Sequence, residues 1–432
     1  MSIKINLIKN TGYNLGCYFY LLLASFFSIS ILLNNLGRDV FGVYIFLISF
    51  IPLAAVFDFG ISNAVIRKLS LPNLDREERV KTWKTSYALF VALALILSVV
   101  VICLLLYLSQ TLPIFAHLDK NILNWSVLLI ALIVLVNHLD NHFLNLAQAE
   151  QRFDIFNTKT LLVGSANTII SAFISGIYPN IAFLFGSQLI FHLLTLTFMI
   201  RYSRKSFSGR DFAPAYDKQT GKELFSFGIK NFVGTLAGQI ENQFSNLILG
   251  AMVSAGAITS FSIPQSIVAK GAGVVSQLAQ VFFPFSASLL AKDRIKKLKT
   301  LVLGIESLVL IGGVSAILLT FTIGQQFLLW WLKDPVVVQT AFPVLKILSF
   351  YFLLASLTPI PTALLQGLNK PQVPSFFAVL TVVLEIIFAL ILVPTFGTIG
   401  VAYSFLLSTI ITIPPFLVYT SYSLTRKINE YQ

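Results

Sequence analysis

Charged side chains are scarce in this chain of 432 residues. Asp, Glu, Lys and Arg make up 11% of it, while 56% of the residues are hydrophobic. Soluble globular proteins carry about 25% charged and about 45–50% apolar residues. The mean hydropathy is +0.83, and no long polar stretch separates the apolar ones. This shortage of charge excludes an ordinary soluble domain and predicts a protein that is solvated mainly by lipid.

Cysteine and sequence signatures of catalysis are also missing. The only two cysteines, Cys17 and Cys103, lie in apolar segments, which argues against a disulfide framework. The chain has no G-x-x-x-x-G-K-[ST] motif, so we expect no nucleotide hydrolysis. No Ser/His/Asp group and no pair of carboxylates stands in a polar segment. We therefore expect no catalytic residue, no enzyme activity and no cofactor, and expect transport energy to come from a partner, an ion gradient or the substrate gradient.

Long apolar runs are what the sequence does contain. A helix needs about 20 apolar residues to cross a bilayer, and counting such runs predicts an all-α polytopic membrane protein with twelve transmembrane helices. The expected spans are 11–34, 41–66, 85–108, 123–146, 160–178, 181–200, 225–250, 257–285, 300–323, 341–365, 374–393 and 400–421.

The distribution of Lys and Arg predicts the orientation, because cytoplasmic connections of membrane proteins are enriched in both. If both termini lie inside, the outer connections hold little basic charge beyond Arg38, Lys120 and Lys333. The inner connections then carry, among others, Arg67, Lys68, Arg76, Arg79, Lys81, Lys84, Arg152, Lys159, Arg201, Arg204, Lys205, Arg210, Lys218 and Lys370. Basic loops beside an anionic leaflet also account for the net charge of +12 without nucleic acid as a partner.

The chain divides into two halves at its longest inner loop. We expect a six-helix lobe over 1–200, a cytoplasmic linker over 201–224 and a second six-helix lobe over 225–432. Short echoes support a repeat: LIKN precedes the first span and GIKN opens the seventh, while LAQAEQR ends the fourth span and LLQGLNK the tenth. With six spans each, the two repeats would share one orientation, as in some transporters.

Two of the expected spans carry polar stripes. The stretch VNHLDNHFLNLAQ (136–148) places Asn137, Asn141 and Asn145 in one row and His138 and His142 beside it, while Leu139, Phe143 and Leu146 hold the other side. Such a stripe faces a water-filled cavity or bonds neighbouring helices. The i, i+4 histidines have metal-ligand spacing, but no third ligand lies nearby, so we expect no metal site.

The seventh span has a matching row of amides, which both donate and accept hydrogen bonds and therefore suit a hydroxyl-rich sugar. The substrate-binding candidates of these two stripes are Asn141, His142, Asn145, Gln239, Asn242, Gln243 and Asn246.

Charged residues inside membrane spans are expensive, and each is a functional hypothesis. Lys270 lies near the middle of the eighth span, followed by Gly271 and Gly273, which would leave room beside its side chain. It could bind an anionic substrate group or pair with a buried acid. The candidates for coupling to protons or sodium ions are Asp58, Glu385, Asp140 and Glu241. The alternative for these acids is a structural role beside a buried cation.

The stretch LGRDVFGVYIFLISFIPLAAVFDFGISNAVIR (36–67) resembles the Wzx-type polysaccharide flippases of the multidrug/oligosaccharidyl-lipid/polysaccharide exporter (MOP) superfamily. These share an LG…FG.Y turn into the second span, followed by D.G and a basic residue at the inner face. LAQAEQRFDIFN (146–157) is a second similar stretch. The resemblance implies a MATE-like, V-shaped pair of lobes that exports a polyprenyl-pyrophosphate-linked oligosaccharide across the bacterial inner membrane by alternating access. It also implies membrane lipid, a polymerase and a chain-length regulator as partners.

Two other functions compete with a flippase. A cation-coupled exporter of drugs or metabolites would share the fold, but Lys270 is an unusual choice for a site that binds organic cations. A membrane glycosyltransferase or polymerase would act on the same lipid carrier and usually carries a long catalytic outer loop. The longest outer loops here are short and hold only Asp119 and Asp334 as acids, which disfavours an enzyme.

Overall fold

The computed structural model describes residues 2–290, 295–368 and 370–430, and the described chain folds into helices without a strand. Ten segments are long and apolar enough to cross a membrane, and each coincides with one of the expected spans. The other two expected spans, 225–250 and 257–285, are also helical and lie within α10 (Lys218–Met252) and α11 (Ala255–Leu290). The all-α polytopic membrane fold is confirmed, and the expected twelve spans are consistent with it.

The chain forms two compact units, residues 1–239 and 240–432. The division falls inside α10, so the linker expected over 201–224 stays a prediction. The first unit holds α1 (Ser2–Leu36), α2 (Arg38–Ile48), α3 (Phe50–Val56), α4 (Ile61–Leu69), α5 (Arg76–Thr111), η1 (Pro113–Phe115), α6 (Lys120–Ala149), α7 (Phe153–Ser165), η2 (Ala166–Ile170), α8 (Ser171–Ile177), α9 (Ile181–Ser203), η3 (Gly209–Asp211) and most of α10.

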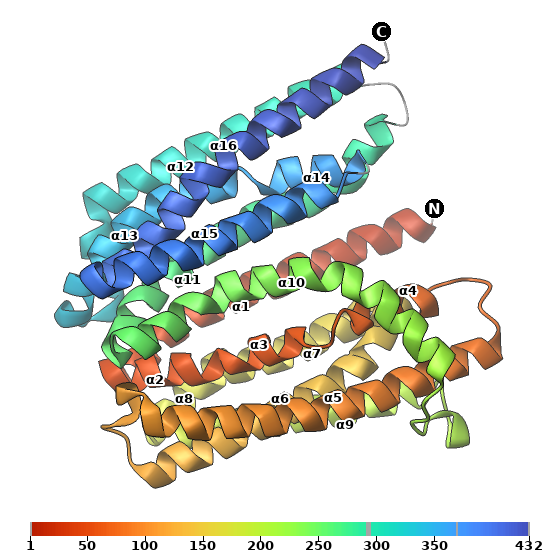
Figure 1. Ribbon diagram of the computed structural model, residues 1–432, viewed down its shortest axis with the longest axis horizontal. Helices are drawn as coiled ribbons and strands as arrows, with labels where there is room; N and C mark the ends of the chain where they lie inside the picture. The colour runs from red at the N-terminus through yellow and green to blue at the C-terminus, as the bar shows by residue number, and fades with distance from the viewer. Residues whose placement is uncertain (1, 291–294, 369, 431–432) are drawn as a thin grey trace. The chain divides into compact units, whose positions relative to one another are not determined.

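The second unit starts with the end of α10. It continues through α11, α12 (Ile295–Leu332), α13 (Pro335–Ser356), α14 (Pro359–Gly367), α15 (Gln372–Phe396) and α16 (Thr398–Glu430). Within each unit the long helices run alongside one another, as Figure 1 shows. Short connectors make this possible: Gly37 and Gly397 adopt φ of +77° and +54° at the turns after α1 and α15, a region that glycine enters without steric cost.

Three of the expected spans are broken helices. The second is divided into α2, α3 and α4, the fifth contains a π-helical turn at Ala166–Ile170, and the tenth is split between α13 and α14. Proline explains the last break, because Pro359 at the first turn of α14 has no N–H to continue the hydrogen bonds of α13. Breaks of this kind expose backbone groups and are tolerated at membrane depth only inside protein or beside a cavity.

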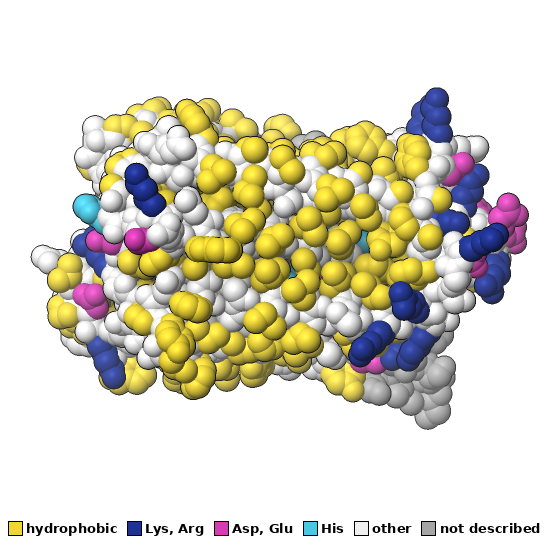
Figure 2. Space-filling view, turned by 90° about the horizontal axis from the view of Figure 1, so that it is seen from below, with side chains coloured by type: hydrophobic (Ala, Val, Ile, Leu, Met, Phe, Trp, Pro, Cys, Tyr) yellow, Lys and Arg dark blue, Asp and Glu magenta, His cyan; other side chains and the backbone are white. Residues whose placement is uncertain are grey.

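The surface has the pattern that a bilayer requires. Figure 2 shows hydrophobic side chains across the middle of one face and charged ones gathered at its two ends, with more Lys and Arg at one end than at the other. The helix α5 illustrates the band: Leu95, Ile96 and Val99 are all more than half exposed, although they are fully apolar. An exposed apolar band of this kind is expected for a multi-pass membrane protein.

Candidate functional site

A cavity of about 140 Å³ with both polar and apolar walls lies inside the second unit. Its polar lining consists of Glu241, Tyr351, Thr358, Thr362, Thr381, Thr409 and Thr412. The spacing along each helix explains this convergence. Thr358 is the N-cap residue of α14, and Thr362 follows four residues later in that helix. Thr409 and Thr412 are three residues apart on α16, so they share one helix face.

The threonine hydroxyls of this cavity present oxygen lone pairs. Thr409 Oγ1 donates to the carbonyl of Phe405 at 3.0 Å, and Thr412 Oγ1 donates to the carbonyl of Ser408 at 2.8 Å. Each hydroxyl hydrogen is thus used within its own helix, while the oxygen remains an acceptor; Thr412 Oγ1 accepts from Thr381 Oγ1 at 2.8 Å. Oxygen acceptors beside a carboxylate are ligands of the kind that hard cations prefer.

Two acids stand at this cavity or near it. The Tyr351 hydroxyl donates to Glu241 Oε1 at 3.2 Å. Glu385 of α15 is 1% exposed and lies close enough to Glu241 to interact with it electrostatically. Within the described residues, Glu385 Oε1 has no hydrogen-bond partner. Two carboxylates that share a region of low dielectric repel each other, and a bound proton or cation relieves the repulsion.

The buried acid of the first unit is neutralised differently. Asp140 of α6 is fully buried, and its Oδ2 lies 3.4 Å from the ammonium of Lys159 on α7. Thr195 of α9 donates to the same oxygen at 3.1 Å. An ion pair withdrawn from solvent needs such additional hydrogen bonds to offset its desolvation. Asp140 therefore has a cation built into the fold.

The structure corrects the position expected for Lys159. The sequence places it in an inner connection. In the structure α7 begins at Phe153, and only 9% of the Lys159 side chain is exposed. The available signal is its position directly before the expected fifth span, 160–178. A lysine so close to a span end more often reaches water by extending its side chain.

The polar stretch of α6 lies mostly inside the first unit. His142 is fully buried, stacks on Tyr87 with ring centroids 4.8 Å apart and lies 3.4 Å from the Ser86 hydroxyl. Asn145 donates to Ser62 at 3.2 Å, while Asn141 is half-buried. These contacts bond α6 to its neighbours. The roles of Asn141, His142 and Asn145 in sugar binding stay predictions.

The amide row of α10 is more open. Asn242 is exposed, Gln239 and Gln243 are half-buried, and Asn246 is 6% exposed. Lys270 lies half-buried on α11. The glycine beside it is not a gap: a Cβ on Gly271 would lie 3.0 Å from the Phe352 ring, so α13 occupies the space expected to be free. The substrate-binding roles of these residues stay predictions.

Asp58 holds a turn. Its Oδ1 accepts from the backbone N–H of Gly60 at 2.8 Å, and its Oδ2 accepts from Ser62 N–H at 3.2 Å at the start of α4. The turn is unusual, because Phe59 and Gly60 both have positive φ, +54° and +74°. The Asp58 carboxylate therefore stabilises the break before α4. Its role in ion coupling stays a prediction.

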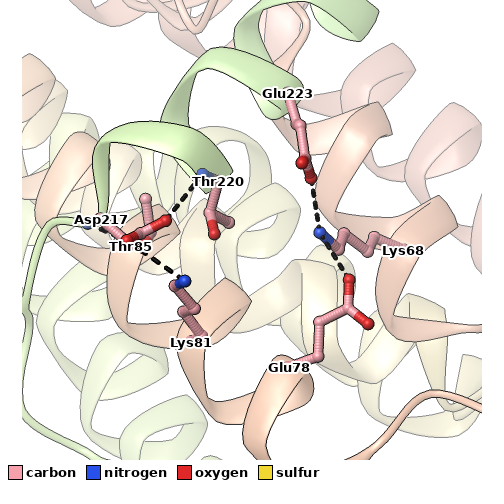
Figure 3. Close-up of polar contacts among 7 residues, drawn as sticks. All are labelled: Lys68, Glu78, Lys81, Thr85, Asp217, Thr220 and Glu223. Atoms are coloured by element: carbon pink, nitrogen blue, oxygen red, sulfur yellow. Dashed lines mark hydrogen bonds and ion pairs between the residues drawn. The ribbon is translucent and has the colours of Figure 1, made fainter.

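Ion pairs tie α4, α5 and the start of α10 together, as Figure 3 shows. The ammonium of Lys68 lies 3.0 Å from Glu78 and 2.9 Å from Glu223, and Lys81 lies 3.3 Å from Asp217. Asp217 also caps α10 by accepting from Thr220 N–H at 2.8 Å.

These contacts shift the pKa values of Lys68 on α4 and Glu223 on α10. Burial lowers the Lys68 pKa, but the hydrogen bonds and charges of Glu223 and Glu78 outweigh it and raise this pKa above its ordinary value. The Lys68 ammonium lowers the pKa of Glu223. Both groups are therefore held in their charged forms.

Comparisons with known proteins agree on family and fold. Residues 7–290 match the family described as "Polysaccharide biosynthesis protein". A Shigella flexneri protein named "Putative O-antigen transporter" is 21% identical over 418 residues, covering 94% of this chain and 96% of that relative.

Solved structures of MATE family transporters of the MOP superfamily share the fold. An inward-facing one has a TM-score of 0.67 at 16% identity and covers 96% of both chains. An outward-facing one has a TM-score of 0.66 at 15% identity and covers 98% of this chain and 95% of the other. The resemblance found in the sequence is confirmed. The chain belongs to the polysaccharide biosynthesis protein family and shares the fold of MATE family transporters.

Proposed function

We propose that this protein is a flippase for a polyprenyl-pyrophosphate-linked oligosaccharide. It moves the lipid-linked repeat unit from the cytoplasmic to the outer leaflet of the bacterial inner membrane for surface polysaccharide assembly, by alternating access and with both termini in the cytoplasm. One observation carries the proposal: the match to the polysaccharide biosynthesis protein family covers residues 7–290 of a polytopic chain with a transporter fold. The protein moves the lipid without a catalytic step, and a polymerase and a chain-length regulator act with it.

The substrate makes two kinds of contact in this proposal. Its sugar hydroxyls bond to the amides of α10, of which Asn242 is exposed and Gln239 and Gln243 are half-buried. Its diphosphate meets the ammonium of Lys270, which offsets part of the desolvation of the anion. Neutral amides and one cation suit a hydroxyl-rich anionic lipid.

Ion coupling belongs to the second unit in this proposal. The cavity beside Glu241 offers carboxylate, phenol and hydroxyl oxygens to a proton or a sodium ion, whereas Asp140 already has Lys159 and Asp58 caps a helix. Glu241→Gln and Glu385→Gln should reduce transport that is driven by an imposed proton or sodium gradient in proteoliposomes. Unchanged dependence on both gradients in both variants would exclude this site.

A cation-coupled exporter of drugs or metabolites is the second candidate. The acidic cavity of the second unit and the MATE fold favour it, because a buried carboxylate also attracts organic cations. The two candidates differ in what accumulates when the protein is absent. Cells that lack a flippase accumulate lipid-linked oligosaccharide in the inner leaflet, while cells that lack an exporter become sensitive to a toxic cation.

Complementation tests the proposal in cells. Deletion of the gene should abolish the surface polysaccharide and leave full-length lipid-linked repeat units facing the cytoplasm, and the wild-type chain should restore export. Normal surface polysaccharide in the deletion strain, with no second flippase present, would reject the proposed function.

A further inference from the structure

A second cavity, of about 240 Å³, lies in the first unit between α4 and the start of α10. It is lined by Ala64, Arg67, Lys68 and Leu71 of α4 and the turn after it, and by Glu223, Leu224 and Phe227 of α10. The cavity combines charged groups with apolar walls. By the Lys and Arg distribution, this end of α4 lies at the cytoplasmic boundary of the membrane.

Arg67 lines this cavity beside Lys68, and the two cations differ in their partners. Its guanidinium lies 4.5 Å from the centroid of the Phe227 ring, and it takes part in no ion pair among the residues that the structure describes. Lys68, Arg76, Arg79, Lys81 and Arg152 each pair with a carboxylate. Arg67 is therefore a cation that an aromatic face supports and no carboxylate neutralises.

We propose that this cavity is the loading site for the diphosphate end of an isoprenoid lipid in the cytoplasmic leaflet, an inference that rests on the proposed function. A guanidinium binds phosphate oxygens through two parallel hydrogen bonds. The first isoprene unit lies against the apolar walls formed by Ala64, Leu71 and Leu224. The charge of Arg67 and the apolar walls thus match the two adjacent parts of one ligand.

Binding also acts on the ion pairs of Figure 3. Lys68 lines the same cavity, and its ammonium lies between Glu78 and Glu223. A diphosphate beside Arg67 competes with Glu223 for Lys68. Because Glu223 belongs to α10 and Lys68 to α4, a loaded lipid weakens one of the contacts that hold these helices together.

Binding of small probes to the purified full-length protein in detergent tests the site. Farnesyl diphosphate presents both parts of the ligand, inorganic pyrophosphate only the charge and farnesol only the isoprenoid chain. We expect farnesyl diphosphate to bind more tightly than either part. Loss of a charged hydrogen-bond donor is worth about tenfold or more in affinity, so Arg67→Gln should weaken its binding by about tenfold, and Arg67→Lys by less.

Two further variants test whether the affinity for farnesyl diphosphate depends on the charges of this cavity and not on other charges nearby. Glu223→Gln removes the competing acid and should tighten binding of farnesyl diphosphate. Arg76→Gln removes an exposed cation at the same end of the unit, paired with Asp211, and should leave the affinity unchanged. Melting temperatures of the Arg67 and Arg76 variants should stay near that of the wild type, because both side chains are exposed. Glu223→Gln loses a half-exposed ion pair with Lys68, which should cost less than about 1 kcal/mol.

Equal affinity of wild type and Arg67→Gln, or an equal loss in Arg76→Gln, would overturn the site. The same holds if pyrophosphate binds as tightly as farnesyl diphosphate, because the apolar walls would then contribute nothing. Each of these results can occur while the wild-type chain still restores polysaccharide export, so failure of the loading site and failure of the proposed function are separate observations.

Discussion

Gly60 and Gly228 bring two stretches of backbone into direct contact. A Cβ on Gly60 would lie 2.3 Å from the carbonyl oxygen of Gly228, and a Cβ on Gly228 would lie 2.5 Å from the carbonyl oxygen of Phe59. The atoms that a side chain would meet are backbone and cannot rotate away. The N-terminal half of α10 therefore packs directly against the turn that starts α4.

Substitution of Gly228 by Ala should destabilise the first unit. The extra methyl group forces two backbones apart, and overpacking of this kind costs about 1–3 kcal/mol. Thermal unfolding in detergent measures the effect. Gly238→Ala in the same helix is the matched control, because its Cβ meets nothing within 4 Å, and it should stabilise the helix by roughly 0.5–1 kcal/mol. A Gly228→Ala protein that melts at or above the wild-type temperature would contradict the contact.

The pair formed by Asp140 and Lys159 should be strongly coupled. Lys159→Met leaves a fully buried carboxylate without its cation, which costs about 3–5 kcal/mol. The double variant Lys159→Met/Asp140→Leu removes both charges and should recover most of the loss. Unfolding of the two single variants, the double variant and the wild type gives the coupling energy as a double-mutant cycle. Arg76→Gln, at an exposed ion pair, should cost less than about 1 kcal/mol.

Additive effects of the two substitutions would show that the ion pair contributes nothing. A loss in Arg76→Gln as large as that in Lys159→Met would show that burial is not the cause.

Hydropathy predicts the spans well, because every apolar run of the required length had to become a helix in lipid. Helical periodicity predicts less about α6. It correctly places His138 beside His142, but it assigns Phe143 and Leu146 to a separate apolar side, whereas both are buried at 1% and 0% exposure. The reason is that α3, α4, α5, α7 and α9 all contact α6. A single helix does not reveal how many neighbours surround it.

The residues that line the cavity of the second unit could not be predicted from single helices either. Glu241 was identified from its charge, but Tyr351 and the threonines were not, because they come from α13, α14, α15 and α16 and meet only in the folded unit. The available signal was the spacing of Thr358 and Thr362, and of Thr409 and Thr412, in otherwise apolar helices. Threonines at these spacings more often bond their own helix backbone, which these also do.

The ion pair of Lys68 and Glu223 should make stability depend on pH. The Lys68 ammonium lowers the Glu223 pKa below its ordinary value of 4.5. Its contribution is therefore fully present above about pH 4.5 and is lost as the pH falls through the lower pKa of the folded state. Because Glu223 is half exposed, with 51% of its side chain accessible, the effect should be less than about 1 kcal/mol.

Melting temperatures of the wild type and of Glu223→Gln, measured between pH 3 and pH 7, check this dependence. The two should differ at neutral pH and converge at acid pH. A constant difference across the whole range would mean that the carboxylate charge is not involved.

The charge of Lys270 should matter more than its shape. Lys270→Arg keeps the cation and should retain partial export of the polysaccharide, while Lys270→Gln should lose export although the protein still reaches the membrane. Complementation of a deletion strain, with membrane levels measured by immunoblot, separates the two effects. Gly271→Ala tests the packing beside it, because its methyl group would meet the Phe352 ring at 3.0 Å without changing charge. Normal export by Lys270→Gln would exclude a role in binding the diphosphate.

Translocation by the purified protein tests the central proposal most directly. Proteoliposomes that contain the wild-type chain and a fluorescent polyprenyl-diphosphate oligosaccharide should expose the lipid-linked sugar to an external glycosidase faster than liposomes without protein. Lys270→Gln should fall to the protein-free rate, and a fluorescent phospholipid in the same vesicles should not be flipped faster than in protein-free liposomes. Equal exposure of the lipid-linked sugar with and without the wild-type protein, under every imposed ion gradient, would contradict the proposed function.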